Sequence, residues 1–510
     1  MRRPRQARGR LLEPQVGARY PRRVTADITG ELVVGLVGPV GTDLRQVSDA
    51  IEQVLERYSF RVVTHRLSKF FEFEHVRRAS GVEIDQNSEY NRIKTSMDAG
   101  DKLRDKSGDD AIMALFAAAE IRGTRSSNNV ANPDRPLDRT AHVLRSLKRP
   151  EEVAKLREIY GARFLLISVF SSDEDRRAYL QHEAGMEENQ AVELTMRDDA
   201  GGAHGQATAK TFELADLFLD GARSREQLEH MIGRFFDLVF GSPLVTPTAD
   251  EHAMFSAFAA SLCSGDLSRQ VGAVVATSRG TIVSEGANDA PRFGGEPYWP
   301  GDSDDRDIVR GRDSNEQIKR KMVGEILREF NALEDGRDVL EVAKRRLAQS
   351  GVLDITEYGR AVHAEMAALM NCARLGTPTE DRWLYCTTFP CHNCAKHIVA
   401  AGIKRVLFIE PYPKSRALEL HRDSLTLSEQ REKVEFRPFV GIGPRRYVEL
   451  FSLRDLRGDR VARKSKSGIV VKWDAKEASP ALPDGVVSYL EREELAWARL
   501  AQIIPQDGSD

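Results

Sequence analysis

Two short motifs, His363-Ala-Glu365 and Pro390-Cys391-His-Asn-Cys394, constrain this chain most. Cys391 and Cys394 are three residues apart, so on a helix their sulfurs lie on the same side of one turn. The spacing of apolar residues predicts alternating helices and strands around the motifs. The predicted order is helix 362–374, strand 383–388, helix 391–401 and strand 405–410. This order brings the start of one helix close to the start of the next.

The residue types in these motifs predict a catalytic zinc site. His363, Cys391 and Cys394 supply three ligands and leave one tetrahedral position for water, whereas structural zinc sites use four protein ligands. Glu365 is then expected to take a proton from that water and transfer it to the substrate. The alternative is a structural site with Cys386 or His392 as the fourth ligand. We expect Cys386 to be buried in the core and His392 to point away.

Residues 30–240 are predicted to form a parallel α/β domain. Strand 31–37 is followed by a glycine-rich turn and a helix over 44–57, and 164–170 reads as a buried strand. The residues of the turn that are expected to bind a nucleotide are Gly35, Gly38, Gly41 and Thr42. Because no lysine precedes Thr42, phosphoryl transfer is disfavoured. A nucleotide-binding or sensing domain and a purely architectural one both remain open.

Chain length and charge predict the organisation of the remaining segments. A chain of 510 residues is too long for one core, and we expect a second domain over 250–510 with a polar insertion at 292–356. The arginine-rich residues 1–29 are expected to be a disordered tail, with nucleic-acid contact as the alternative. A net charge of -3 gives no general attraction to nucleic acid. Five cysteines and no apolar stretch of about 18 residues predict a protein of the reducing cytoplasm with no membrane span.

The motif pair resembles the signature of zinc nucleobase deaminases. Further segments between about 250 and 420 resemble the deoxycytidylate deaminases, namely 264–275, 285–291, 389–396 and 401–406. The resemblance implies a three-layer α/β/α domain of the cytidine-deaminase type. It also implies contacts from Asn288 to the deoxyribose, from the Ala364 N–H to the base carbonyl, and from the Thr388–Phe389 backbone to the leaving amine. Phosphate contacts are predicted for the cations that flank the motifs, which are Arg269, Lys414 and Arg416.

The whole chain resembles the bacterial anti-phage dCTP deaminases, in which a degenerate P-loop, nucleotide-kinase-like regulatory domain precedes the deaminase. Segments 144–153, 159–161 and 440–447 add to this resemblance. It implies deamination of dCTP, dCMP or both to dUTP or dUMP plus ammonia, which depletes a precursor of phage DNA. It further implies an inhibitory RNA, a homo-oligomer and a second nucleotide at the first domain. Two alternatives remain open: an RNA or DNA cytidine deaminase, and a nucleotide-sensing or RNA-binding regulator with a structural zinc site.

Overall fold

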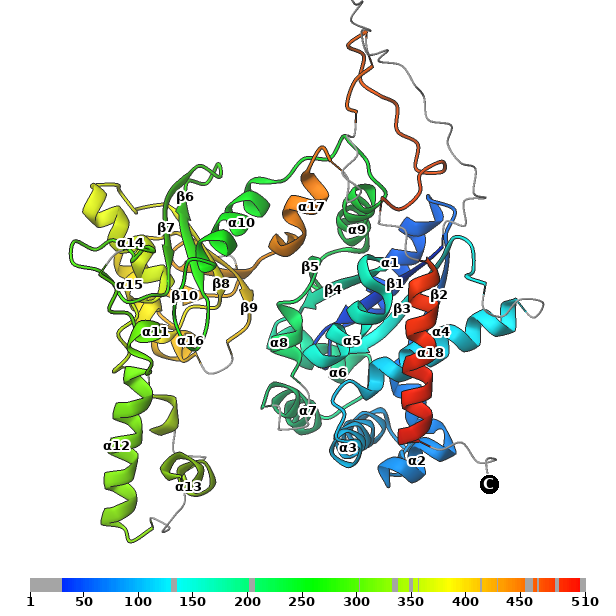
Figure 1. The fold of residues 1–510 in the computed structure, drawn as a ribbon, viewed down its shortest axis with the longest axis horizontal. Coiled ribbons are helices and arrows are strands. Elements are labelled where there is room, and N and C mark those ends of the chain that lie inside the picture. The colour runs from blue at the N-terminus through cyan, green and yellow to red at the C-terminus, as the bar shows by residue number, and fades with distance from the viewer. Residues whose placement is uncertain are drawn as a thin grey trace, which may run out of the picture.

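The computed structural model contains two six-stranded sheets flanked by helices (Figure 1). It describes residues 30–129, 135–200, 207–301, 303–332, 338–347, 352–355, 357–412, 415–428, 430–454, 462–465, 467–481 and 486–504. The predicted tail at 1–29 lies outside these residues. No helix within the described ranges has the length and apolar character needed to cross a bilayer.

The first sheet has the strand order β12-β5-β4-β1-β3-β2. Its parallel strands are β1 (Glu31–Val37), β2 (Arg61–Arg66), β3 (Thr140–Leu147), β4 (Phe164–Phe170) and β5 (Leu217–Asp220). β12 (Gly441–Ile442) pairs antiparallel with β5 from the far end of the chain. Every residue of β1 is buried, because helices cover both faces of the sheet. The predicted parallel α/β arrangement is therefore present.

The chain turns in opposite directions after β1 and after β4. β1 leads through α1 (Leu44–Glu56) towards β2, and β4 leads to β5 on the other side of the sheet. The carboxyl ends of β1 and β4 are thus a topological switch point, where open α/β sheets bind ligands. The other helices of this half are α2 (Glu74–Ser80), α3 (Glu89–Ser107), α4 (Ile112–Asn128), α5 (Pro150–Tyr160), α6 (Asp173–His182), α7 (Glu188–Ala200), α8 (Thr208–Phe212) and α9 (Arg225–Val239).

The second sheet has the order β10-β11-β9-β8-β6-β7. Its strands are β6 (Gly272–Ala276), β7 (Ile282–Ala287), β8 (Trp383–Thr388), β9 (Arg405–Glu410), β10 (Leu425–Thr426) and β11 (Val434–Pro438). Side chains of neighbouring strand residues point to opposite faces of a sheet. On one face, Val274 packs with apolar residues of α10 (Ala249–Ser261). On the other face, Val275 packs with apolar residues of α14 (Ala364–Leu375) and α15 (His392–Ala400). The sheet is the middle of three layers, as the resemblance implied.

The two halves share a hydrophobic core. One apolar cluster contains Phe218 of β5, Met254 of α10 and Leu407 of β9. The C-terminal helix α18 (Val486–Ile503) packs on α4 and α5 of the first half. The expected boundary near 250 placed all later residues with the second domain. In the structure β12 and α18 instead return to the first sheet, where Leu500 and its apolar neighbours are buried.

The segment expected as an insertion forms helices that project from the second sheet (Figure 1). They are α11 (Asp307–Arg310), α12 (Ser314–Glu329) and α13 (Val339–Arg346). Val323, Leu327, Val342 and Ala343 form a small apolar cluster of their own. Two short helices, α16 (Ala417–Leu420) and α17 (Tyr447–Phe451), lie further along the chain.

Candidate functional site

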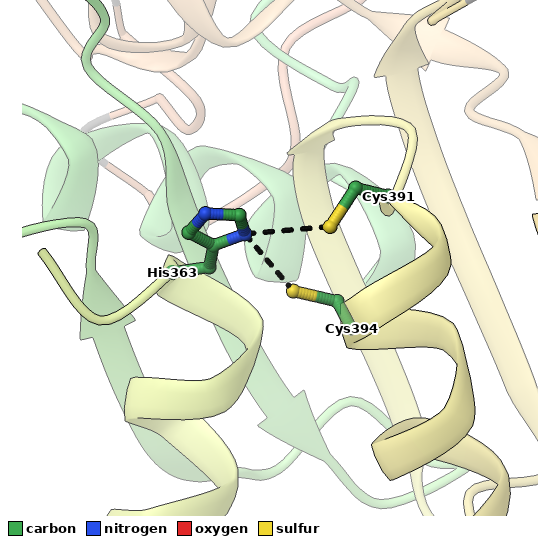
Figure 2. Close-up of side chains that lie close together, drawn as sticks. All are labelled: His363, Cys391 and Cys394. Carbon is green, nitrogen blue, oxygen red and sulfur yellow. Dashed lines mark hydrogen bonds between the residues drawn. The ribbon is translucent and has the colours of Figure 1, made fainter. Parts of the chain in front are cut away.

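His363, Cys391 and Cys394 meet at the ends of two neighbouring helices (Figure 2). His363 is the N-cap of α14, Cys391 is the N-cap of α15, and Cys394 lies in the first turn of α15. The Nδ1 atom of His363 is 3.4 Å from the Cys391 sulfur and 3.3 Å from the Cys394 sulfur. Among the residues that the structure describes, only these three form a group of His, Cys, Asp or Glu side chains with all donor atoms within 4.8 Å of one another.

The protein surroundings favour a thiolate at Cys391. A hydrogen bond from Cys394 and, to a smaller extent, one with His363 outweigh the effect of burial and together lower the pKa of Cys391 to about 3. The unpaired N–H groups at the start of α15 act in the same direction. Two cysteine sulfurs and one imidazole nitrogen are a donor set that fits Zn²⁺, which binds cysteine as the thiolate. These residues can therefore hold the ion.

The alternatives for a fourth protein ligand are not part of this group. Cys386 lies in the middle of β8, is fully buried and packs in the apolar cluster around α14, and burial raises its pKa. Neither Cys386 nor His392 belongs to the group of converging donor atoms in the described chain. Three protein donors leave the position for water that a catalytic zinc site requires.

Glu365 lies in the first turn of α14, close to the metal ligands. Its carboxyl group is buried, with 4% of the residue exposed, and it lines a cavity together with His363 and Cys391. Burial raises the pKa of Glu365, although His363 acts in the opposite direction. A carboxyl group that retains protons more readily than usual is suited to proton transfer near neutral pH.

The cavity has a volume of about 250 Å³ and opens beside the metal ligands. It is lined by most of the residues that the sequence predicted for substrate binding, which are Arg269, Asn288, Ala364, Thr388 and Phe389. Arg416 is the N-cap of α16 and does not line this cavity. Lys414 lies outside the described residues.

Asn288 and Arg269 have protein partners at the cavity wall. The Asn288 amide accepts a hydrogen bond from the Val271 N–H at 2.6 Å and donates one to the Arg269 carbonyl at 2.8 Å. The Arg269 guanidinium pairs with Glu410 at the end of β9. Glu410 also accepts a hydrogen bond from the Thr388 hydroxyl at 2.9 Å. These contacts fix the backbone around the cavity.

The inserted segment also contributes to the cavity, which sequence reasoning missed. Asp307 and Asp313 of this segment line the cavity, together with Arg360, which follows the segment. Arg360 donates to the Asp307 carboxylate at 3.1 Å, and the same carboxylate accepts from the Ser314 N–H at the start of α12. No local pattern in the sequence marks these residues, because their contacts join positions 53 apart in the chain.

The four residues predicted to bind a nucleotide in the first half separate into two sets. Gly35 lies inside β1, where a Cβ atom would come within 2.6 Å of Leu147, so its role is close packing. Gly38, Gly41 and Thr42 lie in the loop between β1 and α1, and Gly41 has a φ of +92°. The Thr42 hydroxyl is buried and has no hydrogen-bond partner among the described residues.

Comparisons with known proteins agree with this geometry. Residues 247–410 match the family described as the cytidine and deoxycytidylate deaminase zinc-binding region. ComE operon protein 2 of Bacillus subtilis (strain 168) is 42% identical over 66 residues, which are 13% of this chain and 35% of that protein. The deoxycytidylate deaminase of Pongo abelii is 35% identical over 107 residues, which are 20% of this chain and 56% of that protein. The matched region thus spans less than two thirds of the length of each of these two relatives.

A search of solved structures found the dCMP deaminase of the cyanophage S-TIM5 in complex with dCMP and dUMP. The matched region covers 38% of this chain and 99% of the cyanophage chain, with 21% sequence identity and a TM-score of 0.23. The family match spans all three metal ligands and Glu365. The described site therefore lies within the part of the chain, residues 247–410, that matches the cytidine and deoxycytidylate deaminase zinc-binding region.

Proposed function

We propose that this protein deaminates a free deoxycytidine nucleotide by hydrolysis. Water replaces the amino group at C4 of cytosine, and ammonia is released. The observation that carries the proposal is the buried Glu365 in a cavity of about 250 Å³ beside three converging zinc ligands. Deamination of a single nucleobase needs a pocket that holds the base and a group that can both accept and donate a proton.

The chain's own residues then have distinct roles. When bound, Zn²⁺ lowers the pKa of water from 15.7 to about 7 and so supplies a hydroxide nucleophile at neutral pH. Glu365 would take one proton from the attacking water and give it to the ring nitrogen, and would then carry the proton of the new C4 hydroxyl to the departing amine, which leaves as ammonia. The Ala364 N–H binds the base carbonyl, and the backbone at Thr388 and Phe389 meets the leaving amine. Asn288 holds the deoxyribose.

Arg269 binds the phosphate of the substrate. Its side chain lines the cavity and is 43% exposed, so a ligand can reach the guanidinium. An arginine can bind phosphate through two parallel hydrogen bonds. Apart from Arg360, the other charged residues of the cavity are acidic and include Asp266, Asp289, Asp307 and Asp313. Because a polynucleotide strand needs a basic groove, these carboxylates favour a free nucleotide over RNA or DNA.

The finer parts of the proposal rest on the resemblance to anti-phage dCTP deaminases. They are dCTP as a substrate, dCTP depletion during infection, control by an inhibitory RNA, a homo-oligomer and a second nucleotide at the first domain. Action in the cytoplasm is proposed from the low cysteine content. The described loop of Gly38, Gly41 and Thr42 at the switch point supports the second nucleotide.

One assay tests the central claim. The purified, zinc-loaded protein is incubated separately with deoxycytidine, dCMP, dCTP, CTP and a cytosine-containing oligonucleotide, and the products are separated by chromatography. We expect uracil products from dCMP or dCTP. Uracil in the oligonucleotide with dCMP and dCTP unchanged would overturn the proposal.

A further inference from the structure

The carboxylate of Asp198 in α7 lies against the loop that follows β1. Its Oδ2 atom accepts a hydrogen bond from the Val40 N–H at 2.7 Å and lies 3.6 Å from the Arg176 guanidinium. Its Oδ1 atom accepts from Lys148 Nζ at 3.3 Å and from the Thr208 hydroxyl at 3.2 Å. Four donors, two of them cationic, thus surround one carboxylate whose side chain is fully buried.

This set of donors is suited to a phosphate group. A main-chain N–H in a loop, an ammonium and a guanidinium are the groups with which proteins bind phosphate oxygens. The Thr42 hydroxyl is a further donor in the same loop that the described chain leaves unused, and 9% of this residue is exposed. The N-terminus of α1 is not the site, because the Asp43 carboxylate accepts from the N–H groups of Arg45 and Gln46.

The helix that carries Asp198 is attached by a small contact. α6 and α7 pack against α3 through an apolar cluster that is separate from the two large cores of the first half. Its buried members are Met97, Leu180, Met186, Ala191 and Leu194. Surface ion pairs such as Arg197 with Asp98 complete the attachment. Segments with few buried apolar contacts open at a lower free energy than core elements do.

We propose that Asp198 is an internal competitor at a phosphate-binding site formed by the Val40 N–H, Lys148, Arg176 and Thr42. A phosphate group enters when α7 withdraws the carboxylate, because two anions cannot share these donors. The proposal deepens the suggestion that the first half binds a second nucleotide, on which it rests. It adds the residue that keeps the site closed.

Withdrawal of Asp198 also affects α8. Thr208 is the first residue of α8 and loses its hydrogen bond when Asp198 leaves. α8 contacts β9 of the second sheet, and β9 ends at Glu410 on the cavity wall. The anion site is therefore connected by direct contacts to the half of the chain that contains the deaminase region.

Pyrophosphate binding to the full-length variants tests the proposal. Asp198→Asn removes the competing charge but keeps an oxygen that can accept from Val40. Asp199→Asn is the matched control, because Asp199 pairs with Arg176 at 3.0 Å on the same helix. In calorimetry we expect Asp198→Asn to bind pyrophosphate at least tenfold more tightly than the wild type and Asp199→Asn. Adding Lys148→Gln to Asp198→Asn should abolish the gain.

Equal affinity in the wild type and Asp198→Asn, or a gain that survives Lys148→Gln, would overturn the proposal. ATP and adenosine serve as further ligands: a nucleotide site binds ATP as well as pyrophosphate, and a site for free polyphosphate binds only the latter. If Asp198→Asn does not fold, hydrogen exchange on the wild type decides. Saturating pyrophosphate should speed exchange in 207–213, and unchanged exchange contradicts the proposal. dCMP turnover by the same samples reports separately on the deaminase assignment.

Discussion

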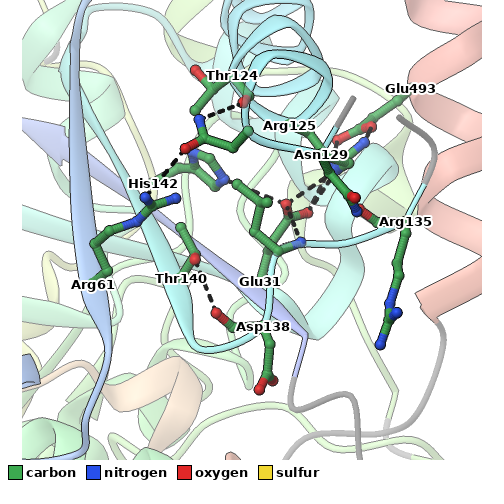
Figure 3. Close-up of polar contacts among 12 residues, drawn as sticks. Glu31, Arg61, Thr124, Arg125, Asn129, Arg135, Asp138, Thr140, His142 and Glu493 are labelled. Carbon is green, nitrogen blue, oxygen red and sulfur yellow. Dashed lines mark hydrogen bonds and ion pairs between the residues drawn. The ribbon is translucent and has the colours of Figure 1, made fainter. Parts of the chain in front are cut away.

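Arg125 near the end of α4 and Glu493 in α18 form an ion pair at 2.6 Å, although 368 positions separate them in the sequence (Figure 3). The same guanidinium pairs with Glu31 of β1 at 2.7 Å. Only 2% of each of these three side chains is exposed. The C-terminal helix is thus joined to the first sheet by a buried network of charges.

Replacing Glu493 should loosen α18. Glu493→Ala leaves Arg125 with one partner fewer in a buried position, and breaking a buried ion pair typically costs 3–5 kcal/mol. We expect a lower midpoint of urea denaturation and earlier proteolytic loss of the C-terminal helix. Glu494→Ala, at an exposed position of the same helix, is the control and should behave as the wild type. Equal midpoints for both variants would contradict the prediction.

Glu31 should make the stability of the folded protein depend on pH in the acidic range. Burial raises its pKa, but His142 and Arg125 outweigh that effect and lower it from 4.5 to about 2. A group with a lowered folded-state pKa stabilises the protein above its unfolded value and loses this contribution as pH falls from about 4.5 to about 2. The shift corresponds to about 3 kcal/mol. Glu493, whose pKa is raised by burial, offsets part of this loss.

Urea denaturation measured between pH 5 and pH 2 tests this prediction. Glu31→Gln should flatten the dependence of stability on pH in this range, and Glu52→Gln, at an exposed position, should not. Identical slopes for Glu31→Gln and the wild type would refute it.

The sequence predicted the surroundings of the metal ligands closely. α14, β8, α15 and β9 lie within two residues of their predicted bounds, because each combines a clear apolar period with a defined start. The convergence of His363 with the two cysteines follows from that order. Cys386 is buried in the core, as expected.

Long-range contacts could not be predicted in this way. The pairing of β12 with β5 and the docking of α18 join residues hundreds of positions apart, and no local pattern encodes them. The contact of Asp198 with Val40 likewise spans 158 positions. Side-chain convergence of this kind depends on the completed fold.

Glu365→Gln should abolish most turnover without loss of the metal. The amide keeps the size of the side chain but cannot accept the proton, and positioned acid–base groups contribute about 10²–10⁴ in rate. Ammonia release from dCMP and dCTP measures activity, and elemental analysis measures zinc. Glu380→Gln, at an exposed position, is the control. Undiminished ammonia release by Glu365→Gln would rule out its role in proton transfer.

Cys391→Ala should lose zinc and stability together. Two remaining ligands hold the ion weakly, and the free energy of metal binding contributes to folding. We expect less than one zinc per chain and a lower melting temperature than that of the wild type. Cys263→Ala, an exposed cysteine outside the site, should change neither quantity. Full zinc content in Cys391→Ala would show that other residues hold the ion.

Arg269→Ala should weaken binding only of phosphorylated substrates. Its guanidinium lines the cavity and lies 5.8 Å from the Tyr412 ring, whereas the metal ligands and Glu365 lie at the ends of other elements. The KM for dCMP or dCTP should therefore rise about tenfold or more with little change in kcat, since charge-assisted hydrogen bonds contribute about 1.5–3 kcal/mol. Any slow turnover of deoxycytidine should be unaffected. Arg279→Ala, at an exposed turn of the β6–β7 hairpin, is the control. An equal loss with deoxycytidine and dCMP would mean that Arg269 supports the cavity wall through Glu410 and does not bind phosphate.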